Sequence, residues 1–472
     1  MKIALVQPWP RDPLPGPLPA SIGEGSEVMP PLGLLYLAGY LRERSSHEPF
    51  VLDAWAERLN DADIVTRLHK AAPDIIGITA MTHTLRDALT VARAAKRAFP
   101  QVPVVMGGPH PTLYPRETLA LSGVDMVLAG EGERPLAMLL DAILSGGRLE
   151  EVPGLGWKKD GVIVVNDECW SADPLDDLPF PAFDAVPVER YGSVLAVRRP
   201  VMSMVTSRGC PYRCSFCDRP LLKGSRWRAH SAERVVAEME RLAGLGVREI
   251  ALYDDTFTVD RQRVLDICRM KRERSPSLLF SVRTRTDLVD EDVLAALAAA
   301  GCVAMHYGIE SGSPPVRERI GKGSGIEEAI TVCDLTRRYG METLAYFMIG
   351  NPGETPEDIA ATERLIERLS PDYLHLTVLM PFPGTPIYRE MLGKGRLAED
   401  VWRRFAIDPS RDIEPPLWEE HLSRAQLLAC RRRIYRRFYG RPGYILSQLR
   451  GVSSLRELGA KAIAGIRLLT MR

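Results

Sequence analysis

The feature that most constrains the fold is a repeated alternation of short apolar runs with helical patterns. It fills residues 1–142 and returns over residues 201–390 of the 472-residue chain. The apolar runs are brief, β-rich and unbroken, which is typical of parallel strands covered on both faces. Because parallel strands are joined by long crossovers, usually helices, each block predicts an α/β unit.

The first block predicts a doubly wound parallel sheet. Helical spacing appears between the apolar runs, at residues 32–44, 62–71 and 84–99. The expected strands are KIALVQP (2–8), PFVLDAW (49–55), DIIGITAM (74–81), VPVVMGG (102–108) and VDMVLAG (124–130).

Threonines and glycines gather where three of these strands end. In open α/β sheets, ligands bind beyond the carboxyl ends of the strands, and glycines there let backbone N–H groups approach an anion such as phosphate. We therefore predict a ligand site at this edge of the sheet. Its candidate residues are Thr79, Thr82, Gly107, Gly108, His110, Thr112, Gly130, Glu131 and Gly132.

Residues 143–200 predict a linker that contains a hairpin around Lys159-Asp160-Gly161 and a proline-rich stretch, 174–187. The second block, residues 201–390, predicts six strand–helix units, which form a partial (β/α)6 TIM-like barrel. Its expected strands lie at 201–207, 249–255, 278–284, 302–310, 342–350 and 373–381. Residues 391–472 predict a helical, increasingly basic C-terminal region.

Charge and apolar content indicate which partners and which cellular compartment to expect. The net charge is zero, so no overall field favours nucleic acid. The N-terminal apolar run is too short for a signal peptide, and no stretch approaches the ~20 apolar residues of a membrane span. A reducing cytoplasm is the expectation. Five cysteines without framework spacing then predict small buried hydrophobic side chains rather than disulfides: Cys169, Cys268, Cys302, Cys333 and Cys430.

The end of the chain is basic, with eleven Lys or Arg against one acidic residue, Glu457, over residues 431–472. We favour a solvated helical cap that balances the acidic remainder. Two alternatives stay open: contact with an anionic membrane surface and contact with nucleic acid.

Three cysteines, Cys210, Cys214 and Cys217, lie in the loop after the first strand of the second block. The carboxyl ends of barrel strands are where the chemistry of such folds is placed. Three interpretations compete. A zinc site needs a fourth ligand, with His230 nearest on the carboxyl side; a redox dithiol needs only C-x-x-C; a four-iron cluster tied through three irons leaves one iron open. Phe216 and the strand-end position favour the third.

The pattern C-x3-C-x-aromatic-C after the first strand of a partial barrel resembles the radical S-adenosylmethionine (radical SAM) superfamily. The resemblance implies that SAM chelates the open iron of a [4Fe-4S] cluster and is cleaved to a 5′-deoxyadenosyl radical. Later strand ends resemble the family's SAM-contacting segments, although Asp254-Asp255 stands where many members have Gly-Gly-Glu. The implied SAM contacts are Phe216, Asp254, Asp255, Glu310, Ser311, Gly350 and Asn351.

The doubly wound block ahead of this barrel is similar to the cobalamin-binding class of the same superfamily. The resemblance places the nine residues of the first predicted site around the corrin and its nucleotide tail. The chain lacks D-x-H-x-x-G, the motif that supplies a histidine to cobalt in other cobalamin proteins. His110 is therefore expected to position the tail rather than to ligate cobalt.

The resemblance predicts a cobalamin-dependent radical SAM enzyme that modifies an unactivated carbon by methyl transfer. The alternatives are a ring-forming, rearranging or oxidative cyclase, a non-catalytic iron–sulfur or zinc protein, and an enzyme that modifies RNA or protein. Expected partners are a small-molecule substrate, with a lipid-like or membrane-associated one left open, and a reductant such as flavodoxin or ferredoxin; nucleic acid is not expected. Peripheral association with the inner membrane surface is left open as well.

Overall fold

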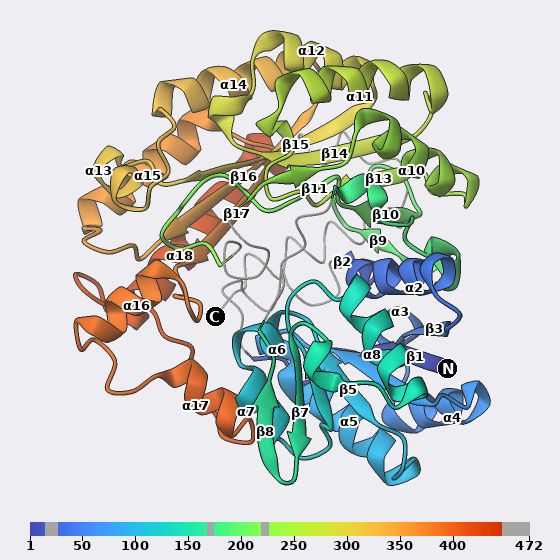
Figure 1. Cartoon of the computed structure of the whole chain (residues 1–472). Helices are drawn as coiled ribbons and strands as arrows, with labels where there is room; N and C mark the ends of the chain where they lie inside the picture. The colour runs from blue at the N-terminus through green and yellow to red at the C-terminus, as the bar shows by residue number, and fades with distance from the viewer. Residues whose placement is uncertain (15–26, 168–173, 219–225, 446–472) are drawn as a thin grey trace.

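The computed structural model describes residues 1–14, 27–167, 174–218 and 226–445. Figure 1 shows two sheets at opposite ends of the molecule, each with its own helices. The helices α16 (Pro386–Gly393) and α17 (Val401–Ile407) run along one side, from the second sheet towards the first. There α17 packs on α7 (Pro115–Ala120), and Arg403 Nε lies 2.9 Å from Glu117 Oε1.

The first sheet is doubly wound, as predicted, with strand order β3-β1-β4-β5-β6 in its parallel part. Its strands are short and their apolar side chains are almost fully buried, Ile3, Ile76 and Val104 at 0% exposure among them. The strands are β1 (Lys2–Gln7), β3 (Glu48–Asp53), β4 (Ile75–Thr79), β5 (Val104–Gly107) and β6 (Met126–Leu128). The helices are α2 (Leu32–Arg44), α3 (Ala54–Glu57), α4 (Asp61–Ala71), α5 (Leu85–Ala98), α6 (Pro109–Leu113) and α8 (Glu133–Ser145).

The predicted hairpin is present, as β7 (Leu155–Lys159) and β8 (Val162–Val165). Asp160 and Gly161 have φ of 50° and 79°, which fits a two-residue type I′ turn. We expected this hairpin to lie in a linker, but β7 pairs antiparallel with β6 and extends the first sheet. The pairing covers what would otherwise be an open sheet edge at β6; hydrophobic periodicity identifies a hairpin but not its partner.

The proline-rich stretch lies across helix α2, as an irregular connection with two short 3-10 turns, Leu175–Asp177 and Phe183–Ala185. The backbone approaches so closely that a Cβ added at Gly39 would lie 2.0 Å from the Phe180 carbonyl oxygen. Ala182 N donates to Leu35 O at 3.0 Å. Glycine at position 39 thus permits the contact.

The second sheet has six parallel strands in chain order, which confirms the partial barrel. Helices cover its outer face (Figure 1). The strands are β10 (Val201–Met204), β13 (Glu249–Leu252), β14 (Leu279–Thr284), β15 (Cys302–Glu310), β16 (Glu342–Ile349) and β17 (Tyr373–Val378). The helices are α10 (Ala232–Gly244), α11 (Arg261–Arg274), α12 (Glu291–Ala299), α13 (Pro314–Arg319), α14 (Ile326–Arg338) and α15 (Pro356–Leu369).

The last described helix, α18 (Arg424–Tyr439), covers the β17 edge of this sheet. Tyr435 and Tyr439, one helical turn apart, accept hydrogen bonds through their hydroxyls from Leu376 N (2.8 Å) and Leu374 N (3.1 Å). The two hydroxyls replace the neighbouring strand that the open edge lacks. The described part of the C-terminal region thus contains the helices α17 and α18 with irregular chain between them, and all residues beyond 445 lie outside the described residues.

The scattered cysteines mostly follow the prediction. Cys268, Cys302 and Cys333 are buried free thiols in the core, whereas Cys430 on α18 is only partly buried. Cys169 lies outside the described residues. Among the helices that the structure describes, none combines the length and the apolar character that a membrane-spanning segment requires.

Candidate active site

The three cysteines lie in the loop that follows β10, at the carboxyl end of the strand, and all three are half-buried. A short ladder of β11 (Ser207–Arg208) with β12 (Arg228–Ala229) precedes the loop. Backbone hydrogen bonds hold its tip, from Ser215 N to Ile320 O and from Ile387 N to Ser215 O, both 3.1 Å. Phe216 packs against a small apolar cluster around Trp418. The loop is therefore anchored by segments that follow β15 and β17.

Two cations lie near Cys214, one of the three cysteines. Burial raises the pKa of Cys214, while the nearby Lys322 and Arg285 act in the opposite direction. The Arg285 guanidinium also lies over the Tyr212 ring, 4.0 Å from its centroid. Cations of this kind stabilise thiolates, so the donor set of three thiols flanked by cations fits an anionic iron–sulfur cluster.

The zinc alternative gains no support. Within the described ranges, no group of three or more His, Cys, Asp or Glu side chains, the three cysteines included, is arranged to hold one metal ion. The predicted fourth ligand, His230, is buried, with its Nδ1 2.9 Å from Asp176 Oδ1. It therefore belongs to a polar contact with the proline-rich connection.

The two aspartates after β13 differ in their surroundings. Asp254 is 1% exposed and accepts three hydrogen bonds of 2.6 Å, from Thr206 N, Thr206 Oγ1 and Ser207 Oγ. Burial raises its pKa, which these hydrogen bonds oppose. Asp254 thus fixes the segment that leads into the cysteine loop, and the half-buried Asp255 is the stronger candidate for a direct SAM contact.

Glu310 ends β15 with a positive φ of 71°, an uncommon conformation for a residue other than glycine. Its Oε1 lies 3.2 Å from Lys322 Nζ. A Cβ at Gly308 would lie 2.7 Å from this carboxylate oxygen and 2.8 Å from the ammonium nitrogen, so a larger residue there would displace the ion pair. Ser311, by contrast, is fully buried against α15, with Oγ 3.3 Å from Thr362 Oγ1. Glu310 thus lies at the carboxyl end of β15, and the next residue, Ser311, is fixed by its contact with α15.

The glycine turn after β16 offers unused acceptors. Glu354 Oε2 accepts from Asn351 N at 2.9 Å and from Gly350 N at 2.5 Å. Within the described part of the chain, Glu354 Oε1 and Asn351 Oδ1 are buried without a hydrogen-bond partner. Burial raises the pKa of Glu354 to about 7. Buried acceptors without donors fit a ligand that carries an amino group, as adenine does.

The edge of the first sheet brings most of its predicted residues together. Thr112 Oγ1 donates to Gly108 O at 2.9 Å and accepts from Gly130 N at 3.0 Å. Gly108 has φ 100°, and a Cβ there would lie 2.8 Å from Thr79 Oγ1. The loops after β4, β5 and β6 thus form one surface, with Gly107 at the end of β5.

His110 is fully buried in this surface. Its Nδ1 lies 3.2 Å from Thr82 Oγ1, and its Nε2 has no hydrogen-bond partner among the described residues. Burial lowers its pKa to about 3, so the ring is neutral. A buried unpaired ring nitrogen fits contact with a ligand at the loops, as the sequence predicts for the nucleotide tail.

Glu131, predicted to lie near the corrin, forms ion pairs with arginines of the second unit. Its carboxylate pairs with Arg228 and lies 3.4 Å from Arg208 Nη1, while Glu133 pairs with Arg208. Arg208 and Arg228 belong to the β11–β12 ladder before the cysteine loop. Gly132 between the glutamates packs on Leu37. The loop after β6 therefore contacts the second α/β unit, a relation that sequence spacing does not reveal.

Sequence reasoning also missed the polar side chains on the inner face of the second sheet. Because side chains alternate along a strand, His306 and Tyr307 face opposite sides of β15. The Tyr307 hydroxyl lies 2.8 Å from Thr336 Oγ1 on α14, so Tyr307 points outward and His306 inward. Tyr346 and His375 share that inner face, with ring centroids 4.7 Å apart.

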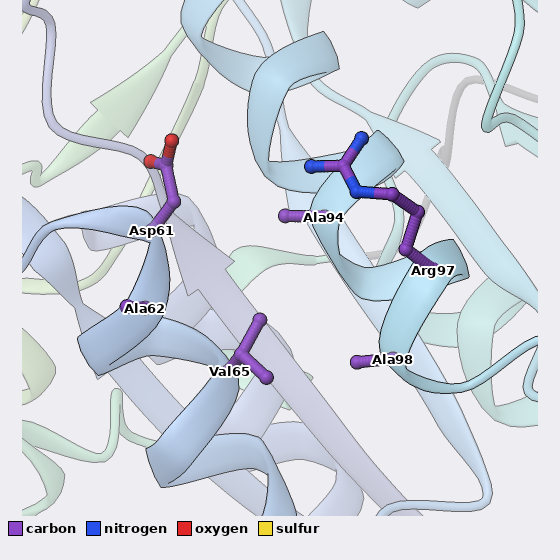
Figure 2. Close-up of a pocket in the computed structure, with 6 residues that line it drawn as sticks. All are labelled: Asp61, Ala62, Val65, Ala94, Arg97 and Ala98. Atoms are coloured by element: carbon purple, nitrogen blue, oxygen red, sulfur yellow. The ribbon is translucent and has the colours of Figure 1, made fainter.

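A separate pocket opens between α4 and α5 on the first unit (Figure 2). None of the predicted site residues lines it. Its lining residues are Asp61, Ala62, Val65, Ala94, Arg97 and Ala98.

Two protein families match this chain, and their ranges follow the two α/β units. The B12 binding domain matches residues 22–140, and the radical SAM superfamily matches residues 204–366. The chain is 35% identical over 422 residues to the uncharacterized methyltransferase PH0819 of Pyrococcus horikoshii, covering 89% of this chain and 90% of that protein. It is 26% identical to the anaerobic magnesium-protoporphyrin IX monomethyl ester cyclase of Rubrivivax gelatinosus, covering 88% and 75%.

Solved structures share the fold. The radical SAM methyltransferase TsrM from Kitasatospora setae, with cobalamin and a [4Fe-4S] cluster bound, matches with a TM-score of 0.68 at 23% identity, covering 83% of this chain and 78% of that one. The cobalamin-dependent SAM radical enzyme OxsB, with aqua-cobalamin and SAM bound, matches with a TM-score of 0.76 at 18% identity, covering 99% and 72%. With both family domains in one chain and 35% identity along most of its length, the chain belongs to the cobalamin-binding radical SAM superfamily.

Proposed function

We propose that this protein is a cobalamin-dependent radical SAM methyltransferase that acts on an unactivated carbon of a small molecule. The observation that carries the proposal is the contact between its two loops. Arg208, two residues before Cys210, pairs with Glu131 and Glu133 of the loop after β6. The cysteine loop and the glycine loops of the first unit are thus held beside each other, as a transfer between two cofactors requires.

The proposed roles follow the geometry. Cys210, Cys214 and Cys217 would hold three irons of a [4Fe-4S] cluster, whose open iron SAM would chelate. When bound, the cluster and SAM supply a 5′-deoxyadenosyl radical, and cobalamin supplies a methyl group. Asp255 and Glu310 would bind the amino acid part of SAM. The turn at Gly350 and Asn351 would contact adenine, beside Phe216.

Cobalamin would lie against the loops after β4, β5 and β6. The buried, neutral His110 would contact the nucleotide tail and not the cobalt, because it is enclosed beneath Thr82 and the loop surface. Thr79, Thr112 and the glycines at 107, 108 and 130 would shape the surface. Glu131 would not contact cobalamin directly but would position the loop after β6 through its ion pairs with Arg208 and Arg228.

The test is anaerobic reconstitution with iron, sulfide and hydroxocobalamin, followed by turnover with SAM that carries a deuterated methyl group. We expect 5′-deoxyadenosine, optical bands of both the cluster and the corrin, and label in the product. Cys214→Ala should abolish 5′-deoxyadenosine formation, whereas the matched control Cys430→Ser, which changes a partly buried thiol outside the site, should not. Failure of the reconstituted protein to cleave SAM would refute the proposal.

A cyclase is the second candidate, favoured by the 26% identity to the magnesium-protoporphyrin ester cyclase. It predicts 5′-deoxyadenosine together with an unlabelled product. The same labelled turnover therefore separates the two candidates.

Electrons for the cluster would come from a flavodoxin or ferredoxin. For the C-terminal region, the described basic residues favour a solvated cap over a membrane contact, because they pair with acidic residues of α15: Arg433 with Glu363, and Arg437 Nε with Glu367 at 2.6 Å. Binding to vesicles with and without anionic lipid tests this assignment, and binding that requires anionic lipid would contradict it.

A further inference from the structure

Six half-buried polar side chains form what we call the lumen cluster. Five come from the second sheet and one from β2 (Glu27–Val28). The members are Glu27, Tyr253, Arg283, His306, Tyr346 and His375.

The cluster continues across the inner face of the sheet. Arg283 is opposite His306 in the β14–β15 register, and Tyr346 is opposite His375 in the β16–β17 register. Ring centroids of Tyr346 lie 4.7 Å from His375 and 6.3 Å from His306. The Tyr346 hydroxyl is 3.5 Å from His306 Nδ1. Four neighbouring strands thus present adjacent polar rings and one cation on the same side.

Arg283 is the charged centre of this cluster. Its guanidinium carbon lies 3.7 Å from the Tyr253 ring centroid, and the Tyr253 hydroxyl donates to Glu27. Within the described ranges, no carboxylate lies within ion-pair distance of Arg283, although the nearby Glu27 acts to raise its pKa, and the Arg283 Nε is buried without a hydrogen-bond partner. An arginine remains protonated inside proteins, and a buried unpaired N–H of this kind is costly.

The histidines do not add positive charge. Burial lowers the pKa of His306 to about 3 and that of His375 to about 4, and Arg283 lowers both further. Both rings are neutral at physiological pH, and each keeps one N–H to donate. Arg283 is therefore the only cation within the cluster, and Glu27, which accepts from the Tyr253 hydroxyl, is its only carboxylate. The other members are neutral rings that can form hydrogen bonds and have flat apolar faces.

We propose that Arg283 binds an oxyanion of the substrate, a carboxylate or a phosphoryl group, while Tyr346 and His375 contact the flat or apolar part beside it. A guanidinium fork matches either oxyanion in a bidentate manner. This inference rests on the proposed function and adds the chemical class of the methyl acceptor, which neither the family nor the loops define.

The test is calorimetric titration of the anaerobic, cluster- and cobalamin-loaded protein with saturating SAM. The probes are benzoate, phenyl phosphate and the neutral benzyl alcohol. We expect at least one of the two anions to bind and benzyl alcohol to bind at least tenfold more weakly. The tighter of the two anions identifies the oxyanion as carboxylate or phosphoryl. Arg283→Gln should weaken anion binding at least tenfold, and Arg283→Lys should weaken it less.

The matched control is Arg261→Gln, which removes an arginine from exposed ion pairs with Asp290 and Asp292 on the outside of the unit. It should leave anion binding unchanged. Unaltered circular dichroism melting and iron content would show that Arg283→Gln is folded. Tyr346→Leu, which removes the flat ring but keeps an apolar side chain, is a second variant and should also weaken anion binding.

Several results would overturn the inference: equal binding of benzyl alcohol, anion binding that survives Arg283→Gln, no anion binding at all, or anions that are displaced as SAM is added. The last would assign Arg283 to the SAM carboxylate. SAM cleavage by the unaltered protein is measured separately. A protein that cleaves SAM but does not bind the anions refutes only the lumen assignment, and one that binds them without cleaving SAM refutes only the proposed function.

Discussion

Arg208 and Glu133 form an ion pair between the two α/β units, with Arg208 Nη2 2.5 Å from Glu133 Oε1 and both side chains largely buried. Burial acts to lower the pKa of Arg208, but Glu133 and Glu131 outweigh it and raise that pKa. For Glu133, burial acts to raise the pKa, and Arg208 outweighs it. Each charge thus depends on the other to remain buried.

Removal of one partner should therefore be costly. We expect Glu133→Gln to lower the free energy of unfolding by about 3–5 kcal/mol, the range for a buried pair that loses one charge. Denaturant unfolding followed by circular dichroism measures it. The control is Glu150→Gln, which breaks an exposed pair with Lys159 at 2.8 Å and should produce no measurable change. Equal effects of the two substitutions would contradict the buried-pair account.

Substitutions of Asp254 and Asp255 should have different effects, because Asp254 supports the cysteine loop and Asp255 is proposed to bind SAM. Asp254→Ala leaves the buried donors of Thr206 and Ser207 unsatisfied, which costs about 1–3 kcal/mol each, so melting temperature and bound iron should both fall. Asp255→Asn should leave the melting temperature and the bound iron unchanged. It should weaken SAM binding about tenfold, the loss expected when a charged hydrogen bond becomes neutral. Iron content and SAM titration distinguish the two. Loss of iron in Asp255→Asn, together with weaker SAM binding alone in Asp254→Ala, would show that Asp255 supports the loop and Asp254 binds SAM.

Gly108 should tolerate no side chain. Gly108→Ala places a Cβ at φ 100°, 2.8 Å from Thr79 Oγ1 and 3.0 Å from Ala80 O. We expect cobalamin binding, followed by its absorption spectrum, to weaken at least tenfold. Gly146→Ala is the matched control, because Gly146 also has a positive φ, 68°, but a Cβ there meets nothing within 4 Å. Similar cobalamin binding by the two variants would argue against a ligand surface at Gly108.

The strand–helix alternation predicted both parallel sheets, because hydrophobic periodicity reports burial directly. The same is true of the cysteine loop and the glycine loops, whose positions follow from strand ends. The ion pairs of Glu131 could not be predicted, since they join residues almost a hundred positions apart. The different roles of Asp254 and Asp255 could not be predicted either. Two adjacent carboxylates cannot be distinguished from the sequence until their hydrogen-bond donors are known.

Edge protection of the second sheet should depend on two hydroxyls. Tyr435→Phe removes the acceptor for Leu376 N and leaves a buried N–H unpaired, at a cost of about 1–3 kcal/mol. Amide hydrogen exchange at Leu376 should accelerate while exchange in β14, away from the edge, stays unchanged. Tyr339→Phe, which removes a hydroxyl 3.2 Å from Glu291 at an exposed site, is the control. Unchanged exchange at Leu376 would mean that the hydroxyl does not protect the edge.

The turn after β16 should make stability depend on pH. Burial raises the pKa of Glu354 from its ordinary value of 4.5 to about 7, so the folded protein binds a proton there that the unfolded chain has released. This contribution is fully present below pH 4.5 and is lost as the pH rises through about 7.

Glu354→Gln keeps an acceptor for Gly350 N and Asn351 N but does not titrate. The stability of the unaltered protein relative to this variant should therefore fall as the pH rises between 4.5 and 7, by up to about 1.4 kcal/mol per pH unit. Urea unfolding at several pH values measures the difference, and Glu150→Gln at an exposed site serves as the control. A difference that stays constant across the window, or that rises with pH, would show that Glu354 is ionised in the folded protein and that its two backbone donors outweigh its burial.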